Sequence, residues 1–125
     1  MTSTEIAIRE LFEKGSTAWN RGDIDGYLAG YWDSDDTRWA RGSSVIRGRR
    51  AIDAAFKARF TSAELMGRIE APELEIQVLS EKDALVFGQL AHTVGDATQM
   101  GLFTVHVRNI GREWFVVSDH FSTDG

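Results

Sequence analysis

The chain has 125 residues, of which 42% are hydrophobic and 26% charged, and this is the profile of one soluble globular domain, residues 1–125. A formal net charge of -5 gives no basic field that would attract a polyanion, so we expect no nucleic-acid partner. The lack of cysteine excludes disulfides, a thiolate nucleophile and cysteine-ligated zinc. No apolar run approaches membrane-spanning length and the opening segment carries acids, so we expect a cytoplasmic protein with no membrane partner.

The N-terminal third has the spacing of helices. Thr2 and Glu5 fit a capping box, and apolar residues then recur along one face, which predicts a helix from about Ser3 to Asn20. Gly22 suits the position just past the end of this helix, and Asp23 can cap a second helix in IDGYLAGYW, residues 24–32. The two helices are therefore expected to form a corner.

After one more helix, the spacing of the apolar residues changes from that of a helix to that of a strand. Residues 33–48 indicate a two-stranded ribbon that turns at Gly42 and Ser43, and RRAIDAAFKARF, residues 49–60, indicates a third helix. Four strands then follow in residues 71–81, 83–94, 99–109 and 113–122, the last three as an antiparallel meander. Helices first and strands last predict an α+β fold, with about three N-terminal helices packed on one side of an antiparallel sheet.

Two-residue turns at 95–96 and 111–112 would fix the register of the meander, although a bulge would shift it. One face then receives Leu90, Phe103, Trp114, Val116, Ser118 and His120, and the other receives Phe87, Leu102, His106, Phe115, Val117, Asp119 and Phe121. Asp119 and His120 point in opposite directions on this register, so their adjacency in DHF does not make a catalytic dyad. The three histidines do not share a face, and we expect no metal site.

Both faces of the predicted sheet carry large apolar side chains, whereas three helices can cover only one face. The uncovered face would be too apolar for a stable monomer, so we expect a homodimer through it. The alternative is that long loops fold over the same patch. The residues expected at the dimer contact are Phe87, Leu102, Phe115, Val117 and Phe121.

The order of these segments resembles the nuclear-transport-factor-2-like superfamily, and most closely its SnoaL-like and ketosteroid-isomerase-like bacterial branch. The likeness is carried by AWNRGDIDGYLAGYWDSDDTRW, then RGRRAIDAAFKARF, then strands that end in GREWFVVSDHFS. The resemblance implies a cone-shaped cystatin-like roll, a pocket open at one end and dimerisation through the outer sheet face. The isomerase residues do not carry over: Gly15 stands in the place of the tyrosine donor, Ala40 or Arg41 in the place of the carboxylate base, and no acid lies near residues 100–102.

A pocket between sheet and helices would have a mostly aromatic wall, which suits a small hydrophobic ligand. We therefore expect a domain that binds a small hydrophobic molecule, with no cofactor. The expected ligand contacts are Trp19, Tyr31, Trp39, Phe56, Phe60, Leu90, Phe103, Trp114 and Ser118.

Two other functions remain open at the level of sequence. One is an isomerase, cyclase or dehydratase that moves a proton with His120 and an acid from Asp35 or Asp36, although His120 equally suits a structural hydrogen bond and the two acids a solvated loop. The other is a homo-oligomeric assembly module. The fold does not choose among the three, because the same fold supports each of them.

Overall fold

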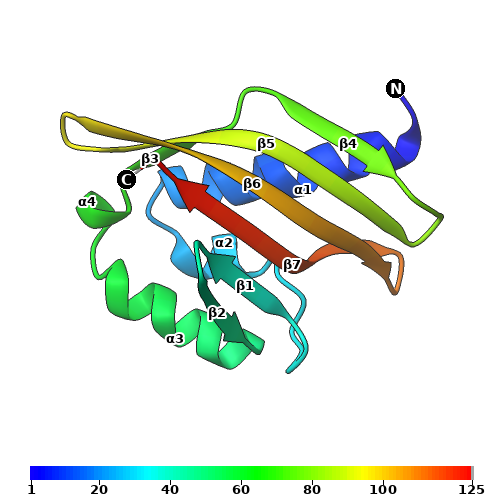
Figure 1. The fold of residues 1–125 in the computed structure, drawn as a ribbon, viewed down its shortest axis with the longest axis horizontal. Helices are drawn as coiled ribbons and strands as arrows, with labels where there is room; N and C mark the ends of the chain where they lie inside the picture. The colour runs from blue at the N-terminus through cyan, green and yellow to red at the C-terminus, as the bar shows by residue number, and fades with distance from the viewer. Residues whose placement is uncertain (125) are drawn as a thin grey trace.

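The computed structural model describes residues 1–124 as helices packed on one side of a curved sheet. The long strands cross over the first helix, and the first ribbon and the third helix lie beside them (Figure 1). The α+β class and the cystatin-like roll expected from the sequence are confirmed. In chain order the elements are α1 (Ser3–Asn20), α2 (Ile24–Leu28), β1 (Arg38–Arg41), β2 (Ser44–Arg47), α3 (Arg49–Arg59), α4 (Ala63–Met66), β3 (Arg68–Glu70), β4 (Leu74–Val78), β5 (Asp83–Val94), β6 (Ala97–Ile110) and β7 (Glu113–Thr123).

The sheet is mixed, and this corrects the expected antiparallel sheet. Its strand order is β2-β1-β7-β6-β5-β3, with β4 also paired to β5. The predicted hairpins are present, since β5, β6 and β7 pair in antiparallel fashion through Val94–Ala97 and Ile110–Glu113. The strand β1, however, runs parallel to β7. Hairpin turns specify pairing only between neighbours in sequence, so they carry no information on this distant pair.

The N-terminal caps predicted for the first two helices are confirmed. The Glu5 N–H donates to Thr2 Oγ1 over 3.1 Å, and the Gly26 N–H donates to Asp23 Oδ1 over 2.9 Å. The second helix is shorter than expected because the chain after it pairs with β7. Val116 donates its N–H to the Gly30 carbonyl and accepts the Trp32 N–H, each over 2.9 Å.

Two short elements, α4 and β3, were not predicted, because three or four residues show no periodicity. Their positions are set by single side chains. Ser62 caps α4 by accepting the Leu65 N–H over 3.2 Å. The Asn20 side chain holds β3 to the end of α1, because it donates to the Ile69 carbonyl over 3.0 Å and accepts the Ile69 N–H over 2.7 Å.

Two glycines in the long strands make room for aromatic rings on the inner face. A Cβ on Gly88 of β5 would lie 2.3 Å from Cζ of Phe103 on β6, and a Cβ on Gly101 of β6 would lie 2.6 Å from the ring of Phe121 on β7. Each ring therefore covers the position of a missing side chain on the neighbouring strand. The two rings add aromatic surface to the inner face.

A bulge interrupts the pairing of β6 with β7. The partners are Val107 with Val116 on one side and His106 with Ser118 on the other, so Val117 is an extra residue in β7. A bulge changes which face the following side chains occupy. The faces expected for Ser118, Asp119, His120 and Phe121 are therefore wrong, and each lies on the side opposite to the one predicted.

Candidate functional site

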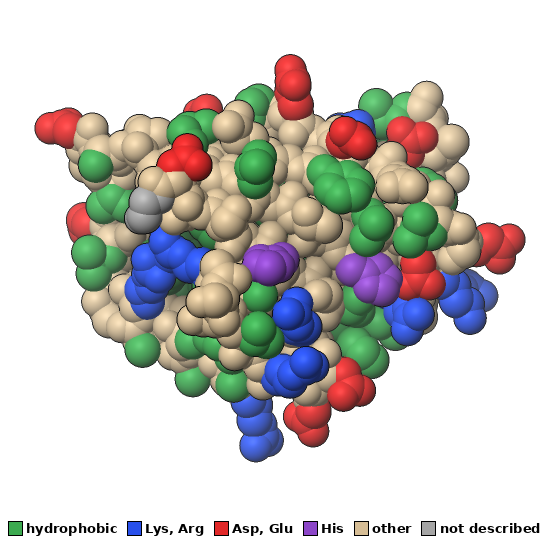
Figure 2. Space-filling model, viewed as in Figure 1, with side chains coloured by type: hydrophobic (Ala, Val, Ile, Leu, Met, Phe, Trp, Pro, Cys, Tyr) green, Lys and Arg blue, Asp and Glu red, His purple; other side chains and the backbone are tan. Residues whose placement is uncertain are grey.

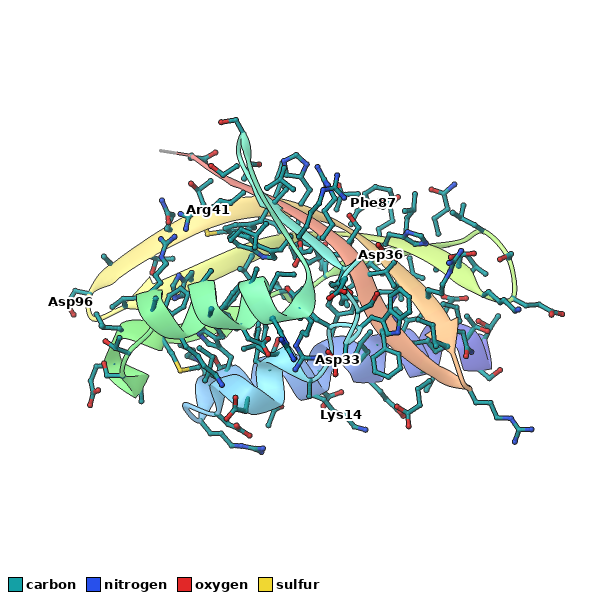
Figure 3. The ribbon with its side chains drawn as sticks, turned by 90° about the horizontal axis from the view of Figure 1, so that it is seen from below. Lys14, Asp33, Asp36, Arg41, Phe87 and Asp96 are labelled. Atoms are coloured by element: carbon teal, nitrogen blue, oxygen red, sulfur yellow. The ribbon has the colours of Figure 1, made fainter. Side chains whose placement is uncertain are left out.

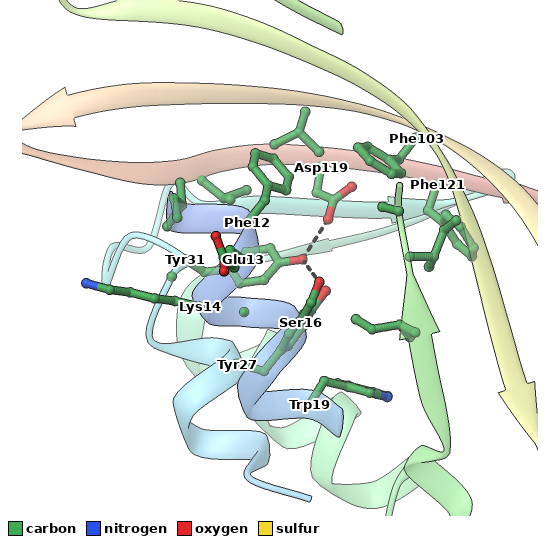
Figure 4. Close-up of a pocket in the computed structure, with 18 of the residues that line it drawn as sticks. Phe12, Glu13, Lys14, Ser16, Trp19, Tyr27, Tyr31, Phe103, Asp119 and Phe121 are labelled. Atoms are coloured by element: carbon green, nitrogen blue, oxygen red, sulfur yellow. Dashed lines mark hydrogen bonds between the residues drawn. The ribbon is translucent and has the colours of Figure 1, made fainter. Parts of the chain in front are cut away.

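A cavity of about 1020 Å³ lies between the inner sheet face and the helices. In Figure 3 the sheet arches over the helices, and Figure 4 shows the cavity from within, with Phe103 and Phe121 on the sheet side and Trp19 on the helix side. The volume is comparable to known small-molecule sites, which are roughly 300–1,000 Å³. Eight of the nine expected ligand contacts line it, namely Trp19, Tyr31, Trp39, Phe56, Phe60, Leu90, Phe103 and Trp114.

Trp19 organises the helix side of the cavity. Its ring packs edge-on against Phe60 at 4.8 Å and Tyr27 at 4.9 Å between centroids. Its Nε1–H donates to the Met66 carbonyl over 2.8 Å, and His92 Nε2 lies 2.6 Å from the same oxygen. Met66 is the last residue of α4, so these two contacts hold the Trp19 and His92 rings against the end of that helix.

The bulge at Val117 brings a carboxylate into this cavity. Asp119 shares a row with Val105 of β6 and Trp39 of β1, both on the inner side, and only 9% of it is exposed. The Tyr31 hydroxyl donates to Asp119 Oδ2 over 2.6 Å, and the Tyr27 and Tyr31 hydroxyl oxygens lie 3.3 Å apart (Figure 4). Asp119 Oδ1 has no hydrogen-bond partner within residues 1–124. A buried acceptor without a partner is rare, and Asp119 is among the residues that line the cavity.

Burial raises the pKa of Asp119 from 3.8 to about 6, although the hydrogen bond from Tyr31 and the nearby His120 charge lower it in part. Burial likewise raises the pKa of Tyr27 and of Tyr31, and the Asp119 charge adds to both increases. The two phenols therefore stay protonated at neutral pH and act as hydrogen-bond donors. A carboxyl group whose pKa lies near 6 can both give and take a proton at neutral pH, as general acid–base chemistry requires.

The residues expected to be catalytic lie away from this cavity. His120 is exposed on the outer sheet face, where its Nε2 lies 3.0 Å from the Gly42 carbonyl. Asp35 and Asp36 are exposed in the loop before β1, and Ser118 is turned from the cavity by the bulge. None of the four lines the cavity. The function proposed below therefore does not use them.

Asp119 was missed as a site residue because its face was assigned without a bulge. One sequence signal could have located it. Trp114 and Val116 are two residues apart and therefore lie on the same face of a regular strand. Phe121 lies on that face only if the strand contains one extra residue between 116 and 121. Such a change of phase within one strand is typical of a bulge.

No group of three or more His, Asp or Glu side chains suited to a metal ion occurs within residues 1–124. In the same part of the chain, no helix is both long and apolar enough to span a membrane.

The structure resembles a group of solved bacterial proteins. An NTF-2-like protein of unknown function from Shewanella oneidensis is 30% identical, with a TM-score of 0.92, over 95% of this chain and 98% of its own. A ketosteroid isomerase-like protein from Erwinia carotovora is 17% identical, with a TM-score of 0.77, over 100% and 99% of the two chains. A Nostoc punctiforme protein with a cystatin-like fold is 17% identical, with a TM-score of 0.79, over 99% and 94%. No protein-family model and no curated protein matches the sequence.

The fold and the cavity define a cystatin-like α+β roll with one aromatic chamber. The similarity to the Shewanella protein covers almost the whole of both chains. The chain belongs to the nuclear-transport-factor-2-like superfamily, as its sequence suggested. The two matches at 17% identity support the fold alone, so the chemistry has to be argued from the cavity.

Proposed function

We propose that this protein binds a small, largely hydrophobic molecule in the cavity and transfers a proton on it through Asp119, as an isomerase, cyclase or dehydratase does. The observation that supports the proposal is the unpartnered Asp119 Oδ1 in an aromatic chamber. A chamber for apolar binding alone gains nothing from a buried carboxylate, which is costly to desolvate. Placed against a ligand, the same carboxylate is a base of useful strength.

Tyr31 and Tyr27 have a positioning role in this proposal. The Tyr31 hydroxyl donates to one carboxylate oxygen, and the other oxygen has no hydrogen-bond partner among the described residues. Tyr27 lies next to Tyr31, and its ring packs 3.7 Å from the Cβ position of Gly15 on α1. A Cβ at residue 15 would therefore be in ordinary van der Waals contact with the Tyr27 ring.

Kemp elimination of 5-nitrobenzisoxazole tests the proton-transfer step without knowledge of the natural substrate. A base removes the C3 proton, the N–O bond breaks and a coloured cyanophenolate forms. We expect turnover that rises with pH through about 6, because the ionised Asp119 is the active form. Asp119→Asn should lower the rate by about 100-fold, the usual contribution of one general base. Tyr31→Phe should move the pH midpoint upward, since its hydrogen bond lowers the pKa of Asp119.

His120→Gln and Asp36→Asn are matched controls, because both side chains are exposed and outside the cavity. Both variants should keep the rate of the native chain. Loss of turnover in either of them, with Asp119→Asn unaffected, would transfer the chemistry to the residues first expected from the sequence. If the neutral dye N-phenyl-1-naphthylamine binds but no variant or native chain turns over the probe, binding alone remains as the function.

We further propose that the outer sheet face forms a homodimer contact. Leu102 is 61% exposed there, and Phe87, Phe115 and Val117 are half-buried. Figure 2 shows apolar and histidine side chains mixed on this face, and Phe87 lies on the side of the sheet away from the helices in Figure 3. Phe121 does not belong to this surface, because the bulge turns it into the cavity.

Light scattering coupled to size-exclusion chromatography tests the dimer. The native chain should elute with twice its monomer mass at micromolar concentration, and Leu102→Glu should yield the monomer because a charge would be buried in the contact. Ile6→Glu on α1 is the control, since Ile6 is a similarly exposed apolar residue away from the sheet. A monomeric native chain would refute the contact.

A further inference from the structure

One end of the cavity carries two arginines from different elements. Arg41 is the last residue of β1 and Arg59 the last residue of α3, and both line the cavity. The Arg41 guanidinium carbon lies 5.9 Å from the centroid of the Phe121 ring, and that of Arg59 lies 5.5 Å from the centroid of Phe60. Each cation is thus held against an aromatic wall residue of the chamber.

Both guanidinium groups lack an ion-pair partner among the described residues. Within residues 1–124, neither arginine is within ion-pair distance of a carboxylate, whereas Arg49 and Arg108 each bond one. Burial, and then the charge of Arg59, lower the pKa of Arg41 below its ordinary value. Two like charges that face one apolar chamber repel each other, and a bound anion would relieve that repulsion.

The strand register separates this cationic end from the carboxylate. Asp119 pairs with Trp39, and Arg41 lies two residues further along β1, opposite Phe121. Two residues along a strand span roughly 7 Å. The wall between the two charges is aromatic, so a ligand that reaches both ends has an apolar middle.

We infer that the ligand is an amphipathic organic acid whose anionic group lies against Arg41 and Arg59, with an apolar body of at least about 7 Å that reaches the Asp119 carboxylate. A carboxylate suits this position because its two oxygens match the donor geometry of a guanidinium. The inference rests on the proposed function, because it assumes that the ligand lies in this cavity. It adds the chemical class of the ligand and the end of the cavity at which its charge is recognised.

Competition against N-phenyl-1-naphthylamine fluorescence tests the inference with decanoate and decanol, which share one alkyl chain and differ in head-group charge. At about pH 8 we expect Arg41→Gln/Arg59→Gln to weaken decanoate about tenfold, the value typical of a hydrogen-bonded ion. Decanol should be unaffected. Added salt should weaken decanoate in the native chain more than in the variant, because it screens the exposed part of the contact.

Arg50→Gln is the matched control, since Arg50 is exposed on the same helix as Arg59 and lies outside the cavity. If the double variant fails to fold, Arg59→Gln at the exposed helix end replaces it, with an expected loss of about threefold for decanoate alone. Equal effects of the substitution on decanoate and decanol would overturn the inference and leave the cavity as a binding site. Failure of the dye itself to bind the native chain would overturn the proposed function as well.

Discussion

Asp119→Asn should stabilise the protein at about pH 8 by about 2 to 3 kcal/mol and have little effect at about pH 4. Burial raises the pKa of the folded-state carboxyl from 3.8 to about 6, so folding favours the protonated form. The stability that Asp119 contributes is therefore complete below about pH 4 and is lost as the pH rises through 6. Asparagine has no charge to desolvate, and its amide oxygen can still accept the Tyr31 hydroxyl.

Urea unfolding at the two pH values measures this difference, with Asp36→Asn as the control because Asp36 is exposed. The control should change stability by less than about 0.5 kcal/mol at either pH. A loss of stability in Asp119→Asn at about pH 8 would mean that the ionised form is the one the fold stabilises, and the Kemp activity would then lack its pH dependence near 6. The combination of a more stable and less active variant is the behaviour expected of a site residue.

The helices and hairpins could be predicted because their signals are local. Thr2, Asp23 and the glycines of the two tight turns each act on residues within a few positions. The eight aromatic and aliphatic wall residues could be predicted for a related reason, since apolar residues at helical or strand spacing gather on one side. Their role in ligand contact remains a prediction.

The position of the polar site could not be predicted in the same way, because it depends on contacts between distant segments. The extra residue Val117 lies where β7 changes partners, from the Gly30–Trp32 segment to β1. No glycine or proline marks that place in the sequence. A shift of one residue exchanges the faces of Asp119 and His120, and this exchange moved the expected chemistry from the cavity to the outer surface.

Gly88→Val should destabilise the protein by about 3 kcal/mol, the upper end of the usual cost of overfilling a core. The side chain at residue 88 would occupy the place of the Phe103 ring, whose Cζ lies 2.3 Å from the Cβ position. The ring would have to swing into the cavity, so the dye N-phenyl-1-naphthylamine should bind less tightly. Urea unfolding measures the first effect and dye fluorescence the second.

Phe103→Ala tests whether the ring itself causes this cost. In that background the space above residue 88 is open, so Gly88→Val should be neutral or slightly stabilising, since valine is favoured in strands. The coupling energy between the two sites should then be about 3 kcal/mol, the upper end of the range seen for residues in direct contact. Gly15→Ala is the control for a glycine with room, because its Cβ would lie at an ordinary 3.7 Å from the Tyr27 ring. If the effects at residues 88 and 103 are additive, the cost of Gly88→Val comes from the backbone conformation and not from the Phe103 ring. The aromatic wall would then not depend on Gly88.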